Sequence, residues 1–269
     1  MFTNIGFWDA GKTLFPLLSL IDRKQYKDIL EGVLNSYRNT GYLPKWLSPD
    51  ERGLMPGTLV DNVIAEASSK KISEEYMDEF LEAMIKASTI DSGDARYGRA
   101  AVDEYIKYRY VPSNIHESVN QTLDNSLSDY SISVVAKNLN KYDIYEKYQN
   151  LSKNYLSLFD KETGFLRAKT EEGEFEKEFN PLSWGSPYTE GSAYQNSYNM
   201  YHDFDAFISE FGGKKEFEKR LDELTNSKTE FDVGHYNQTI HEMREYYEAH
   251  FGHIAISNQP SFHLPYLYN

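Results

Sequence analysis

The sequence predicts an all-α protein, and within that class an incomplete (α/α)6 toroid with at most a small β-hairpin. Three observations lead to this prediction. Apolar residues recur mainly with the period of a helix, and strand-like alternation is weak and brief. About nine expected helices are joined by long and short loops in alternation, which favours helical hairpins arranged around an axis.

The individual elements follow from apolar periods and end signals. Ser73 precedes an apolar stripe that continues to Ile85, which is typical of an N-cap. Gly212 and Gly213 are typical of a helix end. A long amphipathic helix is indicated over 115–140. In chain order, helices are expected over 14–38, 59–71, 73–85, 98–108, 115–140, 142–159, 191–211, 214–225 and 238–250, and the one small hairpin over 164–174.

Long loops lie between these helices, and ordered long loops on a helical scaffold tend to carry function. They are rich in Gly, Pro, Trp and Asp. The loops span 6–12, 41–57, 91–98, 179–191 and 256–266. No linker, low-complexity tract or exact repeat divides the chain.

Charge and composition exclude several classes of function. The formal net charge of −14 disfavours nucleic acid and anionic membrane surfaces as partners. No apolar window is long enough for a transmembrane helix. The chain has no cysteine, which excludes disulfides, thiol catalysis and cysteine-ligated metals. The compartment stays open from these data.

Aromatic residues are unusually frequent, with 22 Tyr, 15 Phe and 3 Trp. Tyr and Trp combine an apolar face with a polar tip, which suits the apolar faces and hydroxylated rim of a sugar ring. The alternative is a Tyr-rich core and surface without any ligand.

Glu190 is the candidate acid of a glycoside hydrolase. It follows Trp184, Pro187 and Tyr188 in a loop and directly precedes an expected helix. An aromatic, partly dry setting raises the pKa of a carboxyl group, as proton donation at neutral pH requires. The alternative is that Glu190 caps the helix that begins at Gly191, because acidic residues favour helix N-termini.

Two further loops offer ligand-binding groups. Trp8 and Asp9 place a stacking ring beside a carboxylate that can hold a pair of hydroxyl groups. Residues 258–263 offer three side-chain oxygens within four positions, and such hard oxygen ligands suit Ca²⁺. The alternative for both loops is that their polar side chains bond to their own backbone.

Other acidic patterns are weaker. His241 and Glu242 begin a truncated zinc-protease pattern without its second histidine, which indicates a solvated helix face. Asp124 and Asp129 lie five positions apart and do not share a helical face well.

Taken together, the motifs resemble the α-mannosidases of glycoside hydrolase family 92. The resemblance follows one order along essentially the whole chain. Its most specific motifs are Tyr-Thr-Glu-Gly-Ser-Ala-Tyr-Gln at 188–195 and Asn-Gln-Pro-Ser-Phe-His-Leu-Pro-Tyr-Leu-Tyr at 258–268. Supporting motifs are Phe-Trp-Asp at 7–9, Gly-Tyr-Leu-Pro-Lys-Trp at 41–46, Met-Pro-Gly-Thr at 55–58, Asp-Asn-Val-Ile-Ala-Glu-Ala at 61–67, Gly-Arg at 98–99 and Ser-Val-Asn-Gln-Thr-Leu-Asp at 118–124.

The resemblance implies a calcium-dependent, inverting exo-α-mannosidase acting on α-1,2-linked mannose of N-glycans or mannan. It implies that Glu190 is the general acid and that a mannose-containing oligosaccharide is the substrate. It assigns Asn258 and Gln259 to the calcium site. The residues that it implies for sugar binding are Trp8, Asp9, Lys12, Arg99 and His263.

The sequence departs from the family pattern at three positions. Gln259 stands where the family has glutamate, so a negative charge near the metal is lost. Phe262 replaces the first of two histidines. Lys12 replaces an arginine, so a bidentate contact becomes a point charge. Similar variants occur in Gram-positive bacterial members.

The resemblance also implies a catalytic domain over 1–269 that lacks both a preceding β-sandwich and the following region with the general base. The aromatic ends of the chain agree with that expectation. We therefore expect the chain alone to be inactive. Two alternatives stay open, a non-catalytic mannoside-binding protein and a plain helical scaffold. The compartment is undetermined, because a signal peptide would lie upstream of Met1, and the cytoplasm is slightly favoured. The oligomeric state is also undetermined.

Overall fold

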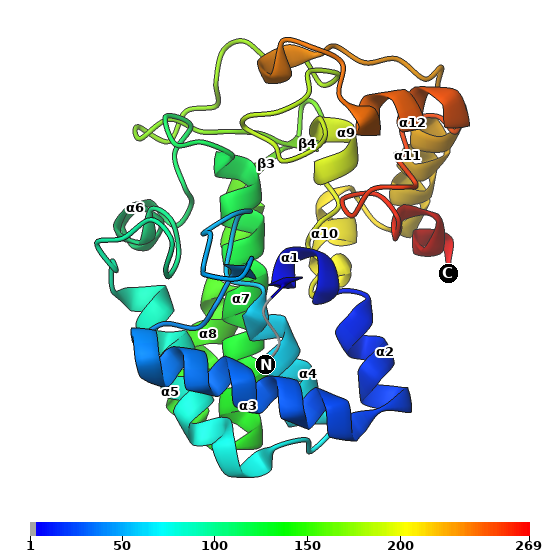
Figure 1. Cartoon of the computed structure of the whole chain (residues 1–269). Helices are drawn as coiled ribbons and strands as arrows, with labels where there is room; N and C mark the ends of the chain where they lie inside the picture. Colours follow the sequence, from blue (N-terminus) through cyan, green and yellow to red (C-terminus); the bar gives the residue numbers. More distant parts are fainter. Residues whose placement is uncertain (1–3) are drawn as a thin grey trace. The chain divides into compact units, whose positions relative to one another are not determined.

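The computed structural model describes residues 4–269, which fall into two compact units (Figure 1). Of the described residues, the first unit comprises 4–109 and Asp124–Asn154, and the second comprises Tyr110–Leu123 and Tyr155–Asn269. Both are built almost entirely from helices, and the described residues form only two small antiparallel strand pairs. The prediction of an all-α protein is confirmed. None of the helices between residues 4 and 269 has the length and apolar character that crossing a bilayer requires.

The first unit begins with a short strand pair, in which Ile5 lies opposite Leu47 and Gly6 opposite Trp46. Its helices pack around a core that includes Phe7, stacked on Phe15 at 5.8 Å between ring centres. The elements of this unit are β1 (Ile5–Gly6), α1 (Phe7–Ala10), α2 (Leu14–Ile21), α3 (Arg23–Thr40), β2 (Trp46–Leu47), α4 (Val60–Ser69), a 3₁₀ turn (Glu74–Tyr76), α5 (Met77–Thr89), α6 (Val102–Tyr108) and α8 (Tyr142–Leu151).

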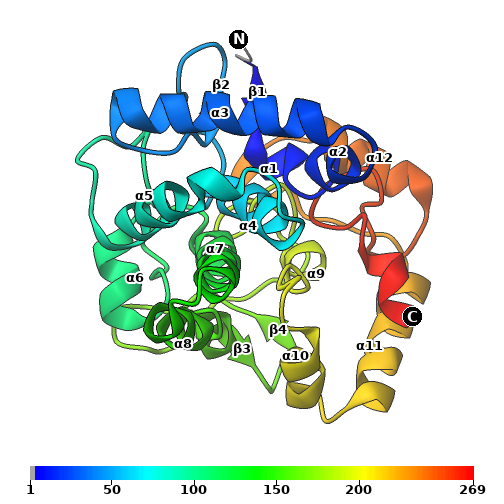
Figure 2. The same ribbon diagram turned by 90° about the horizontal axis from the view of Figure 1, so that it is seen from below.

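Helix α7 (Ser118–Asn138) starts in the second unit and continues through the first. Figure 2 shows it nearly end-on between α4 and α8. The Ser131 hydroxyl donates to Asn62 Oδ1 on α4 at 2.6 Å, and Gln149 Nε2 on α8 donates to the Ser133 hydroxyl at 2.6 Å. The prediction that this helix is amphipathic is wrong. Its polar residues are buried as well, because small hydroxyl side chains bond to neighbouring helices and to the backbone of α7 itself.

The second unit packs aromatic rings between its helices. Phe207 lies 5.1 Å from Phe211 and 6.2 Å from Tyr198 between ring centres. Tyrosines of this kind bear out the idea of a Tyr-rich core. The elements are a 3₁₀ turn (Asn154–Leu158), β3 (Phe159–Asp160), β4 (Phe165–Leu166), α9 (Ala193–Asn196), α10 (Phe204–Glu210), α11 (Lys214–Asn226), a 3₁₀ turn (Gly234–Tyr236), α12 (His241–Ala249) and a final 3₁₀ turn (Leu264–Tyr268).

Three expected helices are interrupted in the structure. The helix expected over 142–159 ends as α8 at Leu151, and a 3₁₀ turn (Asn154–Leu158) and β3 follow it. The helix expected over 14–38 breaks at Asp22, whose side chain accepts from the Gln25 N–H at 2.9 Å and so caps α3. The helix expected over 191–211 breaks between α9 and α10. There the Ser197 hydroxyl accepts from the Leu166 N–H at 3.0 Å, a side-chain bond to backbone outside the helix of the kind that competes with helix continuation.

The predicted helix start at Ser73 and the predicted position of the hairpin also differ from the structure. Ser73 does not cap a helix through its side chain. It adopts a left-handed conformation with φ of 57°, and a 3₁₀ turn precedes α5. The hairpin expected over 164–174 forms earlier, between Phe159–Asp160 and Phe165–Leu166, and a single bridge from Lys169 to Phe175 extends beyond it.

Candidate active site

Glu190 lies in a short loop that the backbone closes, since the Gly185 N–H donates to the Gly191 carbonyl at 2.9 Å. Glu190 has a left-handed backbone with φ of 45°, an uncommon state for a residue other than glycine. Its N–H donates to the Tyr236 hydroxyl at 3.2 Å. Uncommon backbone states of this kind gather at functional sites because the surrounding structure must hold them in place.

Glu190 does not cap the helix that follows. Ser192 does so, because its hydroxyl accepts from the Tyr194 N–H and the Gln195 side chain reaches back to the Ser192 N–H at 2.8 Å. The capping alternative for Glu190 therefore loses its structural basis. The Glu190 side chain is half-buried.

Asn258 joins the two most specific motifs of the sequence. Its Nδ2 donates to the carbonyl of Glu190 at 3.1 Å and to Glu190 Oε2 at 3.3 Å. Asn258 is buried and begins a turn in which the Ser261 N–H donates to the Asn258 carbonyl at 3.0 Å. The expected acid and one expected calcium ligand thus lie in direct contact.

Tyr236 completes the surroundings of Glu190. Burial raises the pKa of its phenol to about 12, and the charges of Glu190 and Glu117 act in the same direction. Burial also raises the pKa of Glu117, which lies half-buried before α7. Tyr236 therefore stays a neutral hydroxyl at any physiological pH and can serve as a hydrogen-bond partner.

The Trp-Asp motif lies in α1, where Trp8 is buried. The Trp8 indole Nε1 donates to Asp124 Oδ2 at 3.1 Å. Lys12 Nζ lies 4.8 Å from the centre of the Trp8 ring. Burial lowers the pKa of Lys12, and the charges of Asp124 and Asp9 oppose that shift. The structure thus brings Trp8, Asp9 and Lys12 together within the first unit.

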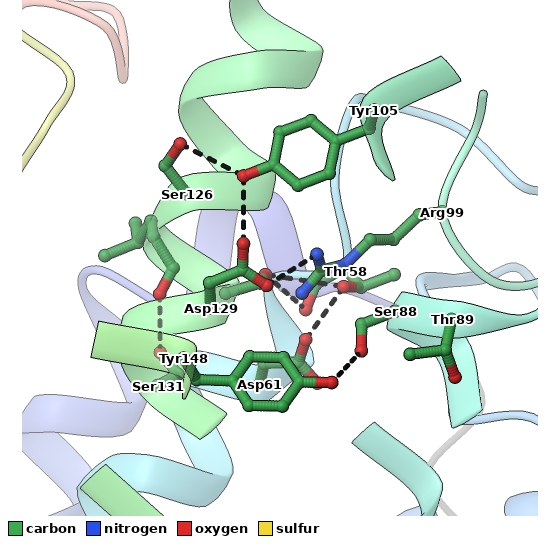
Figure 3. Close-up of polar contacts among 12 residues, drawn as sticks. Thr58, Asp61, Ser88, Thr89, Arg99, Tyr105, Ser126, Asp129, Ser131 and Tyr148 are labelled. Carbon is green, nitrogen blue, oxygen red and sulfur yellow. Dashed lines mark hydrogen bonds and ion pairs between the residues drawn. The ribbon is translucent and has the colours of Figure 1, made fainter. Parts of the chain in front are cut away.

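Arg99 lies in a buried polar network of the first unit (Figure 3). Its Nη1 pairs with Asp129 Oδ1 at 2.7 Å, and the Tyr105 hydroxyl donates to Asp129 Oδ2 at 2.9 Å. The Arg99 side chain is 1% exposed. The structure therefore places Arg99 on an internal carboxylate, and its expected contact with substrate stays a prediction.

A second carboxylate shares this network. Thr58 Oγ1 donates to Asp61 Oδ2 at 2.8 Å (Figure 3). Burial raises the pKa of Asp61 to about 7, although the positive charge of Arg99 acts against the shift. Burial likewise raises the pKa of Asp129. Because one guanidinium faces two buried carboxylates, Asp61 holds a proton over much of the acidic range.

His263 is anchored rather than exposed. Its Nε2 lies 2.9 Å from the Tyr198 carbonyl, so this nitrogen carries the hydrogen. The ring packs 4.6 Å from Tyr201, whose hydroxyl approaches the carbonyl of Gln259 at 3.5 Å. The structure thus groups Glu190 with Asn258, and His263 with Gln259 through Tyr201, all within the second unit.

The donors of the 258–261 turn suit calcium in kind. Asn258 and Gln259 offer amide oxygens, and the buried Ser261 hydroxyl has no hydrogen-bond partner in the structure. Between residues 4 and 269 no group of three or more His, Cys, Asp or Glu could hold a metal. Neutral oxygen ligands favour a hard cation such as Ca²⁺ over a transition metal, but with low affinity because little negative charge is present.

A cavity of about 640 Å³ lies beside the Glu190 loop. Its lining includes Ser186, Pro187 and Tyr188 of that loop, and Phe179. The Arg167 guanidinium lies 4.4 Å from the centre of the Phe179 ring. Further lining residues are polar, namely Ser113, Glu176, Glu178, Asn180 and Ser183.

Sequence reasoning missed several residues of these groups. Asp124 had been set aside because it does not share a face with Asp129, whereas its partner Trp8 comes from 116 positions away. No sequence pattern around Tyr236 indicates its contact with Glu190. The cap at Ser192 could be predicted, because Ser-x-x-Gln is the pattern of a capping box.

Comparison with known protein families and structures extends these observations. The catalytic domain of glycosyl hydrolase family 92 matches residues 1–269. An uncharacterized secreted glycosidase of Arthroderma benhamiae is 25% identical over 288 residues, covering 92% of this chain and 33% of the relative.

Solved structures show the same similarity. A family GH92 inverting mannosidase of Bacteroides thetaiotaomicron superposes with a TM-score of 0.86 at 30% identity, over 100% of this chain and 37% of that one. A GH92 α-mannosidase of the same organism, in complex with mannoimidazole, gives a TM-score of 0.86 at 28% identity, over 99% of this chain and 35% of that one. The chain thus spans about a third of the length of these relatives.

Proposed function

This chain belongs to glycosyl hydrolase family 92, and on that premise we propose that it supplies the acid-bearing part of an inverting, calcium-dependent exo-α-mannosidase. The substrate is a mannose-containing oligosaccharide, with α-1,2-linked mannose of N-glycans or mannan as the expected linkage. The observation that carries the proposal is the contact between Glu190 and Asn258, which joins the expected acid to the expected metal and sugar loop.

Glu190 acts as the general acid. It protonates the glycosidic oxygen as the bond to the leaving sugar breaks, while a base elsewhere activates water on the opposite face of the ring. Asn258 Nδ2 donates to Glu190 Oε2. The carbonyl-type oxygen of a protonated carboxyl group is the better acceptor, so this bond favours the transferable proton on Oε1.

Trp8, Asp9 and Lys12 supply the groups that hold a mannose ring. The indole offers an apolar face, and the carboxylate and ammonium groups offer partners for hydroxyl pairs. Asn258, Gln259 and Ser261 would hold the calcium ion, which would bind sugar hydroxyls and help to polarise water when present. His263 keeps the neighbouring loop in place through the Tyr198 carbonyl.

A chimera tests the function directly. Residues 1–269 replace the matching segment of the inverting mannosidase of B. thetaiotaomicron, and ¹H NMR follows the hydrolysis of α-1,2-mannobiose. We expect β-mannose as the first product, because inversion delivers water to the face opposite the leaving group. A folded chimera that releases α-mannose, or that binds mannosides without cleaving them, would contradict the proposal and support the non-catalytic binding alternative.

A further inference from the structure

Asp124 is a buried carboxylate on α7 that is 2% exposed. A buried charge requires compensation by hydrogen bonds or opposite charges. One compensating group is the Trp8 indole, whose N–H lies 3.1 Å from Asp124 Oδ2 and is itself buried. An indole has only this one donor, so the bond to Asp124 uses the full hydrogen-bonding capacity of the Trp8 side chain.

Two lysines add positive charge around Asp124. Lys12 and Lys45 are both buried, and each has its pKa lowered by that burial against the opposing charge of Asp124. Lys45 is also held near α1 by the backbone, because its carbonyl accepts from the Phe7 N–H at 3.1 Å. Asp124 therefore lies near the side chains of Lys12 and Lys45 as well as the Trp8 indole.

The backbone at Gly57 packs closely against Asp124. Gly57 packs against it so closely that a Cβ at position 57 would lie 2.4 Å from Asp124 Cβ. Gly57 also has φ of 70°, which other residues rarely adopt. The Asp124 side chain is thus confined on one side by Gly57 and bound on another by Trp8.

We propose that Asp124 is a positioning residue, which fixes the orientation of the Trp8 indole and thereby sets the affinity of the site for a mannose ring. The second part rests on the proposed function of Trp8 as a sugar-stacking surface, whereas the first part rests on the contacts of Asp124 alone. A rigid aromatic platform binds better than a mobile one, because no rotamer freedom is lost when the ligand arrives.

The experiment uses the 269-residue chain labelled with ¹⁵N-tryptophan. Its three tryptophans give three indole resonances, and Trp8→Phe assigns that of Trp8. Asp124→Ala removes the acceptor, and Asp124→Asn keeps the shape and a carbonyl oxygen. Ser126→Ala is the matched control, since Ser126 is also buried on α7 but contacts Tyr105 instead. Binding of mannoimidazole is measured by calorimetry in the same variants.

We expect Asp124→Ala to shift the Trp8 resonance and to weaken mannoimidazole binding about tenfold, with a smaller loss for Asp124→Asn. In the Trp8→Phe background the same substitutions should change affinity by less than about twofold, because the residue through which they act is gone. Ser126→Ala should move neither quantity.

Two outcomes would overturn the proposal. An unchanged Trp8 resonance in the Asp124 variants would show that Asp124 does not orient the ring. Equal losses of affinity with and without Trp8 would show that Asp124 acts on the ligand by another route. If Asp124→Ala does not fold, the same comparison with and without Trp8→Phe is made with Asp124→Asn, and its result decides. If the unaltered chain binds no mannoimidazole, the proposed function fails at this site, and the indole resonance alone decides the positioning role.

Discussion

The side-chain amide of Asn258 contacts Glu190 at two points, the backbone carbonyl at 3.1 Å and Oε2 at 3.3 Å, across 68 positions of sequence. One residue thereby contacts both the backbone and the carboxyl group of Glu190. The acid and the 258–261 turn are expected to respond together when either is altered.

Glu190→Gln tests the acid role in the chimera described above. The substitution keeps shape and removes the transferable proton, so turnover of α-1,2-mannobiose should fall about 10²–10⁴-fold. Turnover of an aryl mannoside with a good leaving group should fall much less. Equal losses on both substrates, measured as kcat beside a thermal melt, would remove Glu190 from the acid role.

Asn258→Asp should cost more activity than stability. It replaces a donor by a second carboxylate beside Glu190 Oε2, so kcat on mannobiose should fall about tenfold or more. Asn237→Asp, on an exposed amide in the same unit, is the control and should leave kcat unchanged. Similar losses in both variants would argue for a general effect of charge.

Gln259→Glu should tighten calcium binding. It restores one negative charge among otherwise neutral oxygen donors, so the dissociation constant for Ca²⁺ should fall about tenfold. Calorimetry and thermal melts in Ca²⁺, Mg²⁺ and EDTA measure this. The prediction is contradicted if Ca²⁺ stabilises neither form of the chain, or if Mg²⁺ does so equally well.

Asp61→Asn should change how stability depends on pH. The folded state holds a proton on Asp61 up to about pH 7, whereas the unfolded chain releases it near the ordinary aspartate pKa of 3.8. Stability should therefore fall as pH rises from about 4 to 7, and then level off. Asparagine resembles the neutral form, so this part of the slope should disappear in urea unfolding curves.

Asp28→Asn provides the control for that measurement, because Asp28 is solvent-accessible on α3. The unfolding free energy of the Asp28→Asn variant should depend on pH in the same way as that of the unaltered chain. A slope between pH 4 and 7 that survives Asp61→Asn would assign the buried proton to another group, with Asp129 the first to examine.

Phe179→Ala tests whether the cavity beside the Glu190 loop receives further sugars of a longer glycan. The loss of its ring should lower kcat/KM for a mannose trisaccharide several-fold and leave that for an aryl mannoside unchanged. Phe175→Ala is the matched control, since Arg167 lies 5.3 Å from the Phe175 ring but Phe175 does not line the cavity. Equal effects of the two variants would indicate a loss of packing only.

The fold class and most helices could be predicted from the sequence because apolar periodicity is a local signal. The break at Asp22 was also local, in that Asp is a preferred N-cap, but the apolar pattern on either side concealed it. The break after Asn196 was not local. It depends on Ser197 bonding to Leu166, which lies 31 positions earlier in the chain.

The candidate site divides in the same way. Glu190, Trp8 and Asn258 lie in motifs, so resemblance identified them. Asp124 could not be found by spacing, because its partner is distant in sequence and belongs to a different helix. Tyr236 contributes a single hydroxyl to the backbone of Glu190, and no pattern in the sequence announces such a contact.

The hydroxyl-lined interior of α7 has a consequence for sequence change. Ser126, Ser128, Ser131 and Ser133 are all buried, and the last two donate to carbonyls one turn earlier in their own helix. Ser126 and Ser128 bond instead to Tyr105 and Thr58, outside α7. The polarity of Ser131 and Ser133 is thus met within α7, and their small volume lets α4 and α8 approach. In a randomised library these positions should tolerate alanine or glycine far better than valine or leucine. The size of the side chain, rather than its polarity, would then decide which variants fold.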